Sequence, residues 1–174
     1  QIAVPFTPAT GPRLLTPHPE LAPALLRAAE TLCRENGLSS AHATFIEPEQ
    51  VSVFEDAGWQ VETHGQKGFN GVALLSRLPL EDVTRGLPGD ATDEQARWIE
   101  ASVIGPRHAV RLAGLYLPNG NPAPGPKYDY KLAWMERMQA RAGQLLATEK
   151  PGVMAGEYNV IPTPAEAKRP EAWG

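Results

Sequence analysis

Gly152-Val153-Met154-Ala155-Gly156-Glu157-Tyr158-Asn159-Val160-Ile161-Pro162 is the stretch on which the expected fold depends. A short apolar run ends at a glycine, and an acid and an amide follow two positions apart. This pattern predicts a buried strand whose C-terminal end presents Glu157 and Asn159 from a turn. Because side chains two positions apart on a strand lie on the same side, we expect both polar groups in one pocket.

A carboxylate beside a carboxamide suits hydrolysis at phosphorus, where a metal ion, a polarised water and positioned hydrogen bonds supply most of the catalysis. The same two residues are equally consistent with an Asx-type turn that carries a solvated acid. The local pattern therefore leaves a catalytic and a structural interpretation open.

The composition is that of a single globular domain over residues 1–174. A chain of 174 residues with 42% hydrophobic content can bury a core. Its net charge of -4 gives no global basic field for nucleic acid, so DNA binding would rest on local basic groups. Cys33 has no cysteine partner for a disulfide, and no apolar run reaches membrane-spanning length. We expect no membrane partner and a cytoplasmic location.

Apolar periodicity predicts alternating strands and helices along the chain. Strands are expected at 2–6 and 41–46, with a helix between them that stops at Gly37 and a second helix from Pro48 to Gly58. Further on, 61–63 reads as a half-buried strand, 71–76 as an inner strand and 85–94 as a loop. Gly105 and Pro106 reverse the chain between strands at 98–104 and 109–115. A helix with one apolar face then follows Lys131.

This pattern predicts an α/β (α+β layered) protein with a mixed or antiparallel sheet packed with helices. Four stretches in order also resemble exodeoxyribonuclease III, of the endonuclease/exonuclease/phosphatase superfamily: HGQKGFNGVALLS (64–76), RGLPGD (85–90), LYLPNG (115–120) and GEYN (156–159). The resemblance covers about residues 59–174. It implies half of the family's two-sheet sandwich and Mg²⁺-dependent hydrolysis of DNA phosphodiesters in DNA repair. One departure is that Glu157 stands where the family has aspartate.

The resemblance implies that Tyr116, Glu157 and Asn159 are catalytic, with Tyr116 acting as a neutral donor to the developing charge. Glu47 follows the predicted strand 41–46 and takes the place of the family's principal metal ligand, although its flanking residues differ from the motif. A helix-capping or solvated acid is the alternative interpretation of Glu47. The residues expected near DNA or phosphate are Lys67, Arg97, Asn119, Lys127 and Lys131, and the lysines are alternatively solvated side chains.

Several catalytic parts of the family have no counterpart, so we expect weak activity or none. The early strand with a metal-site asparagine is absent, and no histidine lies in the context of the family's final Asp-His pair. The extra methylene of Glu157 moves its carboxylate by roughly an ångström, which can cost about a hundredfold in rate. Loss of the general base costs ~10²–10⁴ more. A missing second half would leave a sheet face uncovered, which predicts a homodimer, repacked helices or marginal stability.

The N-terminal third resembles a different family. VPFTPATGPRLL (4–15), SSAHATF (39–45) and AGW (57–59) resemble FemAB-like proteins of the acetyltransferase-related superfamily. The resemblance implies an acyl-CoA-dependent acyltransferase fragment over 1–59, with a join near 57–60. Gly11 stands alone beside Pro12, however, where a coenzyme A site calls for a glycine-rich pyrophosphate loop. The alternative interpretation of the whole chain is therefore a chimera that serves as a non-catalytic scaffold.

Overall fold

The fold is given by a computed structural model, which describes residues 16–37, 48–67, 70–161 and 163. The described strands form two sheets. The first is the antiparallel pair of β1 (Gln60–Gly65) and β2 (Gly71–Ser76). The second has the order β3-β4-β5-β6 and contains β3 (Leu80–Arg85), β4 (Trp98–Ile104), β5 (Ala109–Tyr116) and β6 (Gly152–Glu157).

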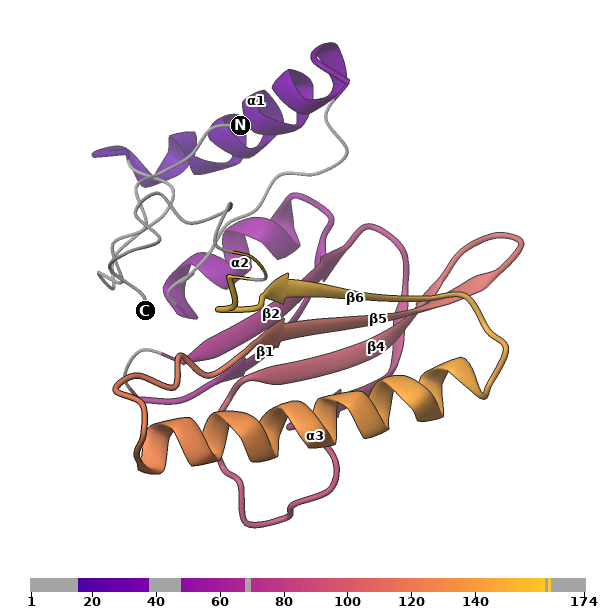
Figure 1. Ribbon diagram of the computed structural model, residues 1–174. Coiled ribbons are helices and arrows are strands. Elements are labelled where there is room, and N and C mark those ends of the chain that lie inside the picture. The colour runs from indigo at the N-terminus through magenta and orange to yellow at the C-terminus, as the bar shows by residue number, and fades with distance from the viewer. Residues whose placement is uncertain (1–15, 38–47, 68–69, 162, 164–174) are drawn as a thin grey trace.

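The described helices are α1 (Ala22–Glu35), which follows a short 3-10 turn, α2 (Pro48–Asp56) and the long α3 (Pro126–Leu146). Helix α3 runs along one face of the second sheet, and strands β1 and β2 lie on the other face (Figure 1). None of the helices in the described part of the chain is long and apolar enough to cross a membrane.

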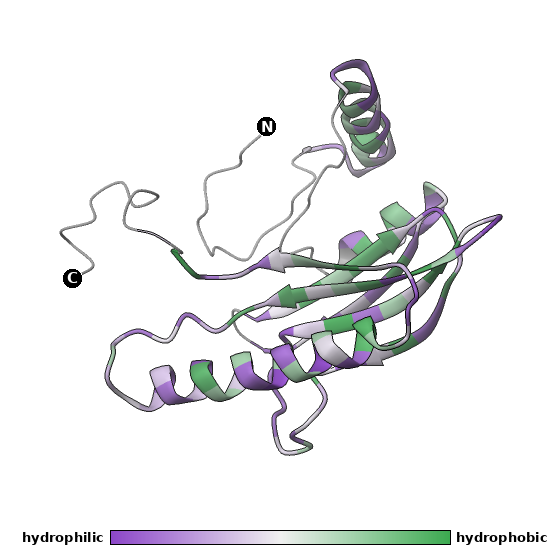
Figure 2. Ribbon diagram, turned by 45° about the vertical axis from the view of Figure 1, so that its right-hand side comes forward, coloured by the Kyte–Doolittle hydropathy of each residue, from purple (hydrophilic) through white to green (hydrophobic). Residues whose placement is uncertain are grey.

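Side-chain alternation along β4 explains these layers. Trp98 points to the α3 side and meets Trp134 edge to face, with ring centroids 6.3 Å apart. Ile99 points to the opposite side and packs with Leu74 of β2. Figure 2 shows hydrophobic segments in the strands and an alternation of hydrophobic and hydrophilic residues along α3. The layered α/β architecture expected from the sequence is thus confirmed.

Gly114 on β5 sets how closely the two sheets approach. A Cβ atom at this position would lie 3.3 Å from Leu74 Cδ2 and 3.4 Å from Ile99 Cγ2. These distances are tighter than most real contacts of a Cβ atom. The absence of a side chain therefore lets β2 pack directly onto β5.

The second sheet is mixed. Strands β3, β4 and β5 pair antiparallel, with the reversal between β4 and β5 at Gly105 and Pro106 as expected. Strand β6 returns through α3 and pairs parallel to β5, in a register that places Tyr116 opposite Glu157. A parallel neighbour requires such a crossover connection, and the helix supplies it.

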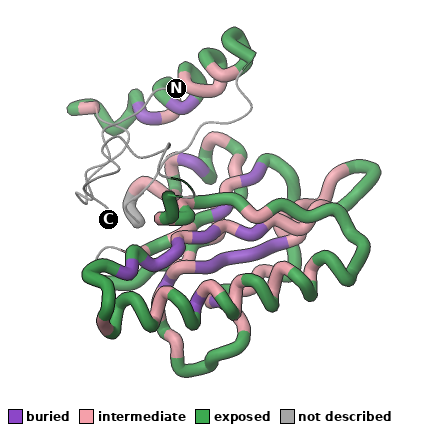
Figure 3. The backbone as a smooth tube through the Cα atoms, viewed as in Figure 1, coloured by how far each residue is buried: buried purple, intermediate pink, exposed green. Residues whose placement is uncertain are grey.

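Three strand expectations need correction. Strand β6 was expected to be buried, but it pairs only with β5 among the described strands and four of its six residues are exposed (Figure 3). Strand β2 is not an inner strand of a larger sheet among the described residues, because it pairs with β1 alone and buries its apolar side against the second sheet. Strand β3 was not expected, because its Glu-Asp-Val-Thr sequence has few strand signals. The predicted strands at 2–6 and 41–46 lie outside the described residues.

Glu100 is a buried carboxylate on the α3 side of β4. Its side chain is fully buried and accepts a hydrogen bond from Arg111 Nη2 at 2.8 Å. Arg141 on α3 also pairs with it, with Nε 3.2 Å from Oε2. Burial raises the pKa of Glu100, but the hydrogen bonds from Arg141 and Arg111 outweigh burial and leave this pKa below its ordinary value. The carboxylate is therefore held ionised between two arginines.

Helix α1 is joined to the sheet part by Glu30. Its Oε1 accepts a hydrogen bond from Trp59 Nε1 at 3.1 Å and pairs with Arg77. The Arg77 guanidinium lies 4.6 Å from the centroid of the Trp59 ring. These contacts connect residues on the two sides of the expected join near 57–60.

Candidate active site

Tyr116 and Glu157 lie side by side at the ends of two parallel strands. They are register partners on β5 and β6, and Leu117 N continues the pairing by donating to Glu157 O at 2.8 Å. Register partners on neighbouring strands project from the same face of a sheet. Two of the three expected catalytic residues are therefore brought together.

Asn159 does not continue the alternation of β6. Its φ of +46° is left-handed, a conformation that asparagine tolerates better than most residues. The turn directs Asn159 Nδ2 to Leu117 O, 2.8 Å away. The amide thus ties the turn after β6 to the loop after β5, which differs from the expected side-by-side arrangement with Glu157 on one strand.

Gly156 explains why the motif begins with glycine. Its φ is +151°, and a Cβ atom would lie 1.9 Å from Leu115 O. Only a residue without a side chain allows β6 to approach β5 this closely just before Glu157.

Asn119 and Lys131 belong to one contact group beside this turn. Asn119 Oδ1 accepts from Asn121 N at 3.1 Å, which forms an Asx-type turn. Lys131 Nζ donates to Asn119 O at 3.2 Å and to Asn159 O at 2.8 Å. Burial lowers the pKa of Lys131. The lysine expected to contact DNA thus bonds the backbone of both loops.

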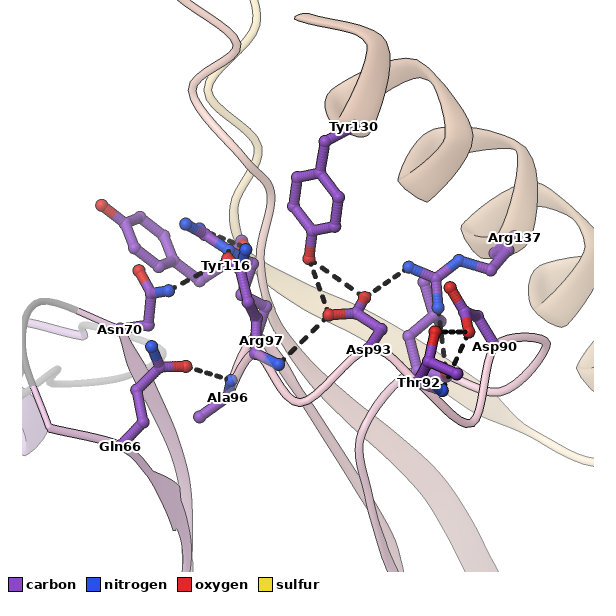
Figure 4. A network of polar contacts seen from close by, with 12 residues as sticks. Gln66, Asn70, Asp90, Thr92, Asp93, Ala96, Arg97, Tyr116, Tyr130 and Arg137 are labelled. Carbon is purple, nitrogen blue, oxygen red and sulfur yellow. Dashed lines mark hydrogen bonds and ion pairs between the residues drawn. The ribbon is translucent and has the colours of Figure 1, made fainter. Parts of the chain in front are cut away.

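Arg97, also expected near DNA, packs against Tyr116. Its guanidinium lies 5.0 Å from the Tyr116 ring centroid, Nη1 donates to Tyr116 O at 3.2 Å and Nε donates to Gln95 Oε1 at 2.6 Å (Figure 4). Burial lowers the pKa of Arg97, against the opposing effects of Tyr130, Tyr116 and Asp93. Arg97 therefore holds the tyrosine ring and the end of β5 in place.

The loop between β1 and β2 is held by two side-chain amides to the segment just before β4. Gln66 Oε1 accepts from Ala96 N at 2.6 Å, and Asn70 Nδ2 donates to Gln95 Oε1 at 3.1 Å. Lys67 is exposed in this anchored loop, and Lys127 is exposed in the first turn of α3. Both lysines are accessible to a phosphate.

Sequence reasoning missed a half-buried polar cluster formed by Asp93, Tyr130 and Arg137. The Tyr130 hydroxyl lies 3.0 Å from both carboxylate oxygens of Asp93, and Arg137 Nη2 pairs with Asp93 at 2.5 Å (Figure 4). Burial and the hydrogen bond to Asp93 raise the pKa of Tyr130 to about 12. One signal was available: Tyr130, Trp134 and Arg137 recur at helical spacing, which predicts one inward face of α3.

Of the acids considered as metal ligands, the structure describes Glu157 but not Glu47. Among residues 16–37, 48–67, 70–161 and 163, no three His, Cys, Asp or Glu side chains gather into a metal cluster. Glu47, the predicted ligand, lies outside the described residues. Mg²⁺ is commonly bound by one or two carboxylates together with water and substrate phosphate. The carboxylate of Glu157 at the strand ends suits such a donor set.

The sequence is similar to one known family and to exodeoxyribonuclease III. Residues 1–71 match the FemAB-like family, described as peptidoglycan biosynthesis and recognition. Exodeoxyribonuclease III of Haemophilus influenzae is 30% identical over 115 residues, which cover 64% of this chain and 42% of that protein. Both resemblances expected from the sequence are confirmed.

Solved structures give the same result for the fold. The 3'-5' exonuclease NExo of Neisseria meningitidis superposes with a TM-score of 0.68 and 29% identity, over 88% of this chain and 60% of that one. A Neisseria 3' phosphatase NExo structure with a product DNA hairpin has the same TM-score and identity, over 87% and 59%. An AP endonuclease of Archaeoglobus fulgidus has a TM-score of 0.65 and 29% identity, over 84% and 57%.

The chain thus spans between 42% and 60% of the length of these relatives. The structural match to NExo extends over more of the chain than residues 59–174, which are about two thirds of it. The exonuclease III-like fold therefore includes part of the segment that precedes Trp59.

Proposed function

We propose that this exonuclease III-like chain carries part of a Mg²⁺-dependent site that hydrolyses phosphate esters of DNA. The observation that carries the proposal is the adjacent placement of Tyr116 and Glu157 at the ends of β5 and β6. The loops bearing Asn119 and Asn159 adjoin this pair. A relative with this fold is a 3' phosphatase bound to a product DNA hairpin, which supports DNA as the substrate class.

In this proposal each residue has a stated task. Glu157 acts as acid/base or as a carboxylate next to the metal, and Tyr116 donates a hydrogen bond to the leaving oxygen. Asn159 fixes the turn through Leu117 O and presents its remaining amide atoms to phosphate. Glu47 and Glu157 would hold Mg²⁺, which neutralises charge on the phosphate oxygens when bound.

The DNA backbone would approach over the exposed lysines, Lys67 and Lys127. With a net charge of -4, binding depends on these local cations and weakens steeply with salt. Glutamate at position 157, in place of the aspartate that the resemblance implies, makes the expected turnover slow. The proposal therefore has to be tested at low salt and with product detection sensitive enough for few turnovers.

The test is a Mg²⁺ titration with two substrates, a duplex with an abasic site and a hairpin with a 3' phosphate. Cleavage should require Mg²⁺, stop with chelator, and fall at least a hundredfold in Glu157→Gln and about tenfold or more in Tyr116→Phe. Glu136→Gln, on the exposed side of α3, is the matched control and should retain activity. Activity that survives Glu157→Gln, or absence of both cleavage and binding, would contradict the proposal and favour the non-catalytic scaffold.

The FemAB-like match over residues 1–71 favours a second candidate, acyl transfer by the N-terminal segment. Coenzyme A or an acyl-CoA should then raise the melting temperature, because a ligand that binds only the folded state stabilises it. An unchanged melting temperature at millimolar coenzyme A would remove this candidate.

Self-association is a further part of the proposal, as is a cytoplasmic location. Both faces of the central strands β4 and β5 are covered, by β2 and by α3, so the uncovered face expected from the sequence is reduced to the region of β6. There Met154 lines an apolar groove of about 470 Å³ together with Leu132 and Met135, and Val153, on the opposite side of the strand, is 50% exposed. Light scattering after size-exclusion chromatography tests for the homodimer, and a monomer at all concentrations would contradict it.

A further inference from the structure

Lys131 contacts both loops of the candidate site, the loop after β5 and the turn after β6. Its Nζ lies 2.8 Å from Asn159 O and 3.2 Å from Asn119 O, so one ammonium group bonds the turn after β6 and the loop after β5. Its aliphatic stem crosses Gly120, where a Cβ atom would lie 2.6 Å from Lys131 Cδ. Gly120 has a φ of +82° and leaves the room that the lysine stem occupies.

The bonding of this lysine differs from that of a phosphate-binding side chain. A lysine ammonium has three donors, and two of them are used by backbone carbonyls. Lys131 is half-buried, and this burial lowers the pKa of its ammonium group. Lys127 lies one helical turn earlier on α3 and is exposed, as a residue that meets a phosphate from solvent would be.

A second link completes the connection between the loops. Asn159 Nδ2 donates to Leu117 O at 2.8 Å, and Leu117 N donates to Glu157 O at 2.8 Å. The segments 117–119 and 157–159 are thus joined directly by backbone and amide bonds, and from the side by Lys131. Removing the ammonium would release both carbonyls and leave the turn that carries Glu157 less constrained.

We propose that Lys131 is a positioning residue: its ammonium cross-links the loop after β5 to the turn after β6 and so fixes Glu157 against Tyr116, and it does not bind DNA phosphate. This role deepens the proposed function and rests on it for its catalytic consequence. The cross-link itself is a property of the folded chain. It is therefore measurable whether or not DNA is hydrolysed.

The experiment compares Lys131→Met, Lys131→Arg and the matched control Lys127→Met in the full chain. Amide hydrogen exchange in segments 117–121 and 157–161 should be at least tenfold faster in Lys131→Met than in the wild-type chain. Lys127→Met should leave exchange there unchanged, and Lys131→Arg should restore most of the protection. If Lys131→Met does not fold, Lys131→Gln, which removes the charge and has a shorter side chain with two amide N–H donors, takes its place in the same comparison.

DNA affinity against salt concentration separates positioning from phosphate contact. Loss of one phosphate contact reduces the slope of log affinity against log salt by about one. Lys131→Met should leave the slope unchanged, while Lys127→Met should reduce it. If cleavage is measurable, Lys131→Met should lower kcat by roughly a hundredfold at nearly constant KM, because misplacement of a catalytic group by about 1 Å has that effect. Lys131→Arg should recover part of this loss in kcat.

A reduced salt slope in Lys131→Met together with unchanged exchange would overturn the proposal and assign Lys131 to phosphate. Unchanged amide exchange in Lys131→Met would by itself also overturn the proposal, since the cross-link would then not constrain the two loops. If no variant and no wild-type sample binds DNA, the proposed function fails. The exchange comparison then still decides the positioning role.

Discussion

Replacing Glu100 by glutamine should lower the melting temperature of the chain by about 6–12 °C, which corresponds to a loss of about 3 kcal/mol. Glu100 is fully buried, and its carboxylate pairs with both Arg111 and Arg141. Glutamine has nearly the same volume, so the change removes the negative charge without opening a cavity. Two arginines are then left around a neutral amide.

The magnitude follows from the exposure of the partners. Removing one member of a buried ion pair costs about 3–5 kcal/mol, because the remaining charge is left buried and uncompensated. The side chains of Arg111 and Arg141 are 17% and 22% exposed, so each guanidinium keeps some contact with water. Glutamine also still accepts a hydrogen bond. Both facts place the expected loss at the lower end of that range.

The same group predicts a pH dependence. The pKa of Glu100 is below its ordinary value of 4.5, so the folded state prefers the ionised carboxylate. Its contribution to stability is therefore complete above pH 4.5 and is lost as the pH falls below 4.5 through the folded-state pKa. Glu100→Gln should flatten this part of the stability profile.

Calorimetry at pH 7 and at a series of pH values down to 3 is the assay, with Glu136→Gln as the exposed control on α3. The control should change the melting temperature by less than about 2 °C, as surface substitutions do. A Glu100→Gln variant that melts with the control would refute the reasoning. So would an acid-induced loss of stability that is the same in the variant and the wild type.

Three further predictions test other parts of the fold. Gly156→Ala should prevent β6 from pairing with β5, because the added Cβ atom would lie 1.9 Å from Leu115 O. The control Gly152→Ala, whose Cβ atom would have its nearest contact at 3.5 Å, should fold. Circular dichroism and melting curves compare the two variants, and equal melting temperatures would contradict the steric argument. Spectrophotometric titration should show one tyrosine that ionises near pH 12, and this ionisation should be absent in Tyr130→Phe. Because the pKa of Tyr130 is raised in the folded state, its contribution to stability is present below pH 10 and is lost as the pH rises toward 12. Glu30→Ala should speed proteolysis of α1 without changing exchange in β4, because Glu30 bonds both Trp59 and Arg77; unchanged cleavage would show that α1 is held otherwise.

The elements with a strong periodic signal were predictable from the sequence. Apolar residues at helical spacing gave α1 and α3, and turn residues at 105–106 gave the antiparallel β4–β5 pair. Strand β3 was not predictable in this way, because its acids face solvent and a bulge between Glu81 and Thr84 interrupts its register. The exposure of β6 was also hidden, since an apolar run does not reveal whether a strand lies at the edge of a sheet.

The candidate site was predictable in its residues but not in their bonding. Family motifs and strand ends located Tyr116 and Glu157, and the parallel register makes them neighbours. Nothing in the sequence showed that Lys131 and Arg97 bond backbone carbonyls, because that depends on how α3 and the start of β4 dock against the loops. Long cationic side chains look alike in sequence whether they meet solvent, phosphate or their own chain.

The parallel pairing of β5 and β6 has a consequence for the order of folding. Tyr116 and Glu157 are separated in sequence by the whole of α3, and strands of this kind meet only after a long loop has closed. The antiparallel pairs β1–β2 and β4–β5 are joined by short loops and can form before that closure. An early intermediate would thus contain hairpins without a site. In refolding, recovery of the site should coincide with the slowest step that docks α3, and a chain nicked between α3 and β6 should lose the site before it loses its hairpins.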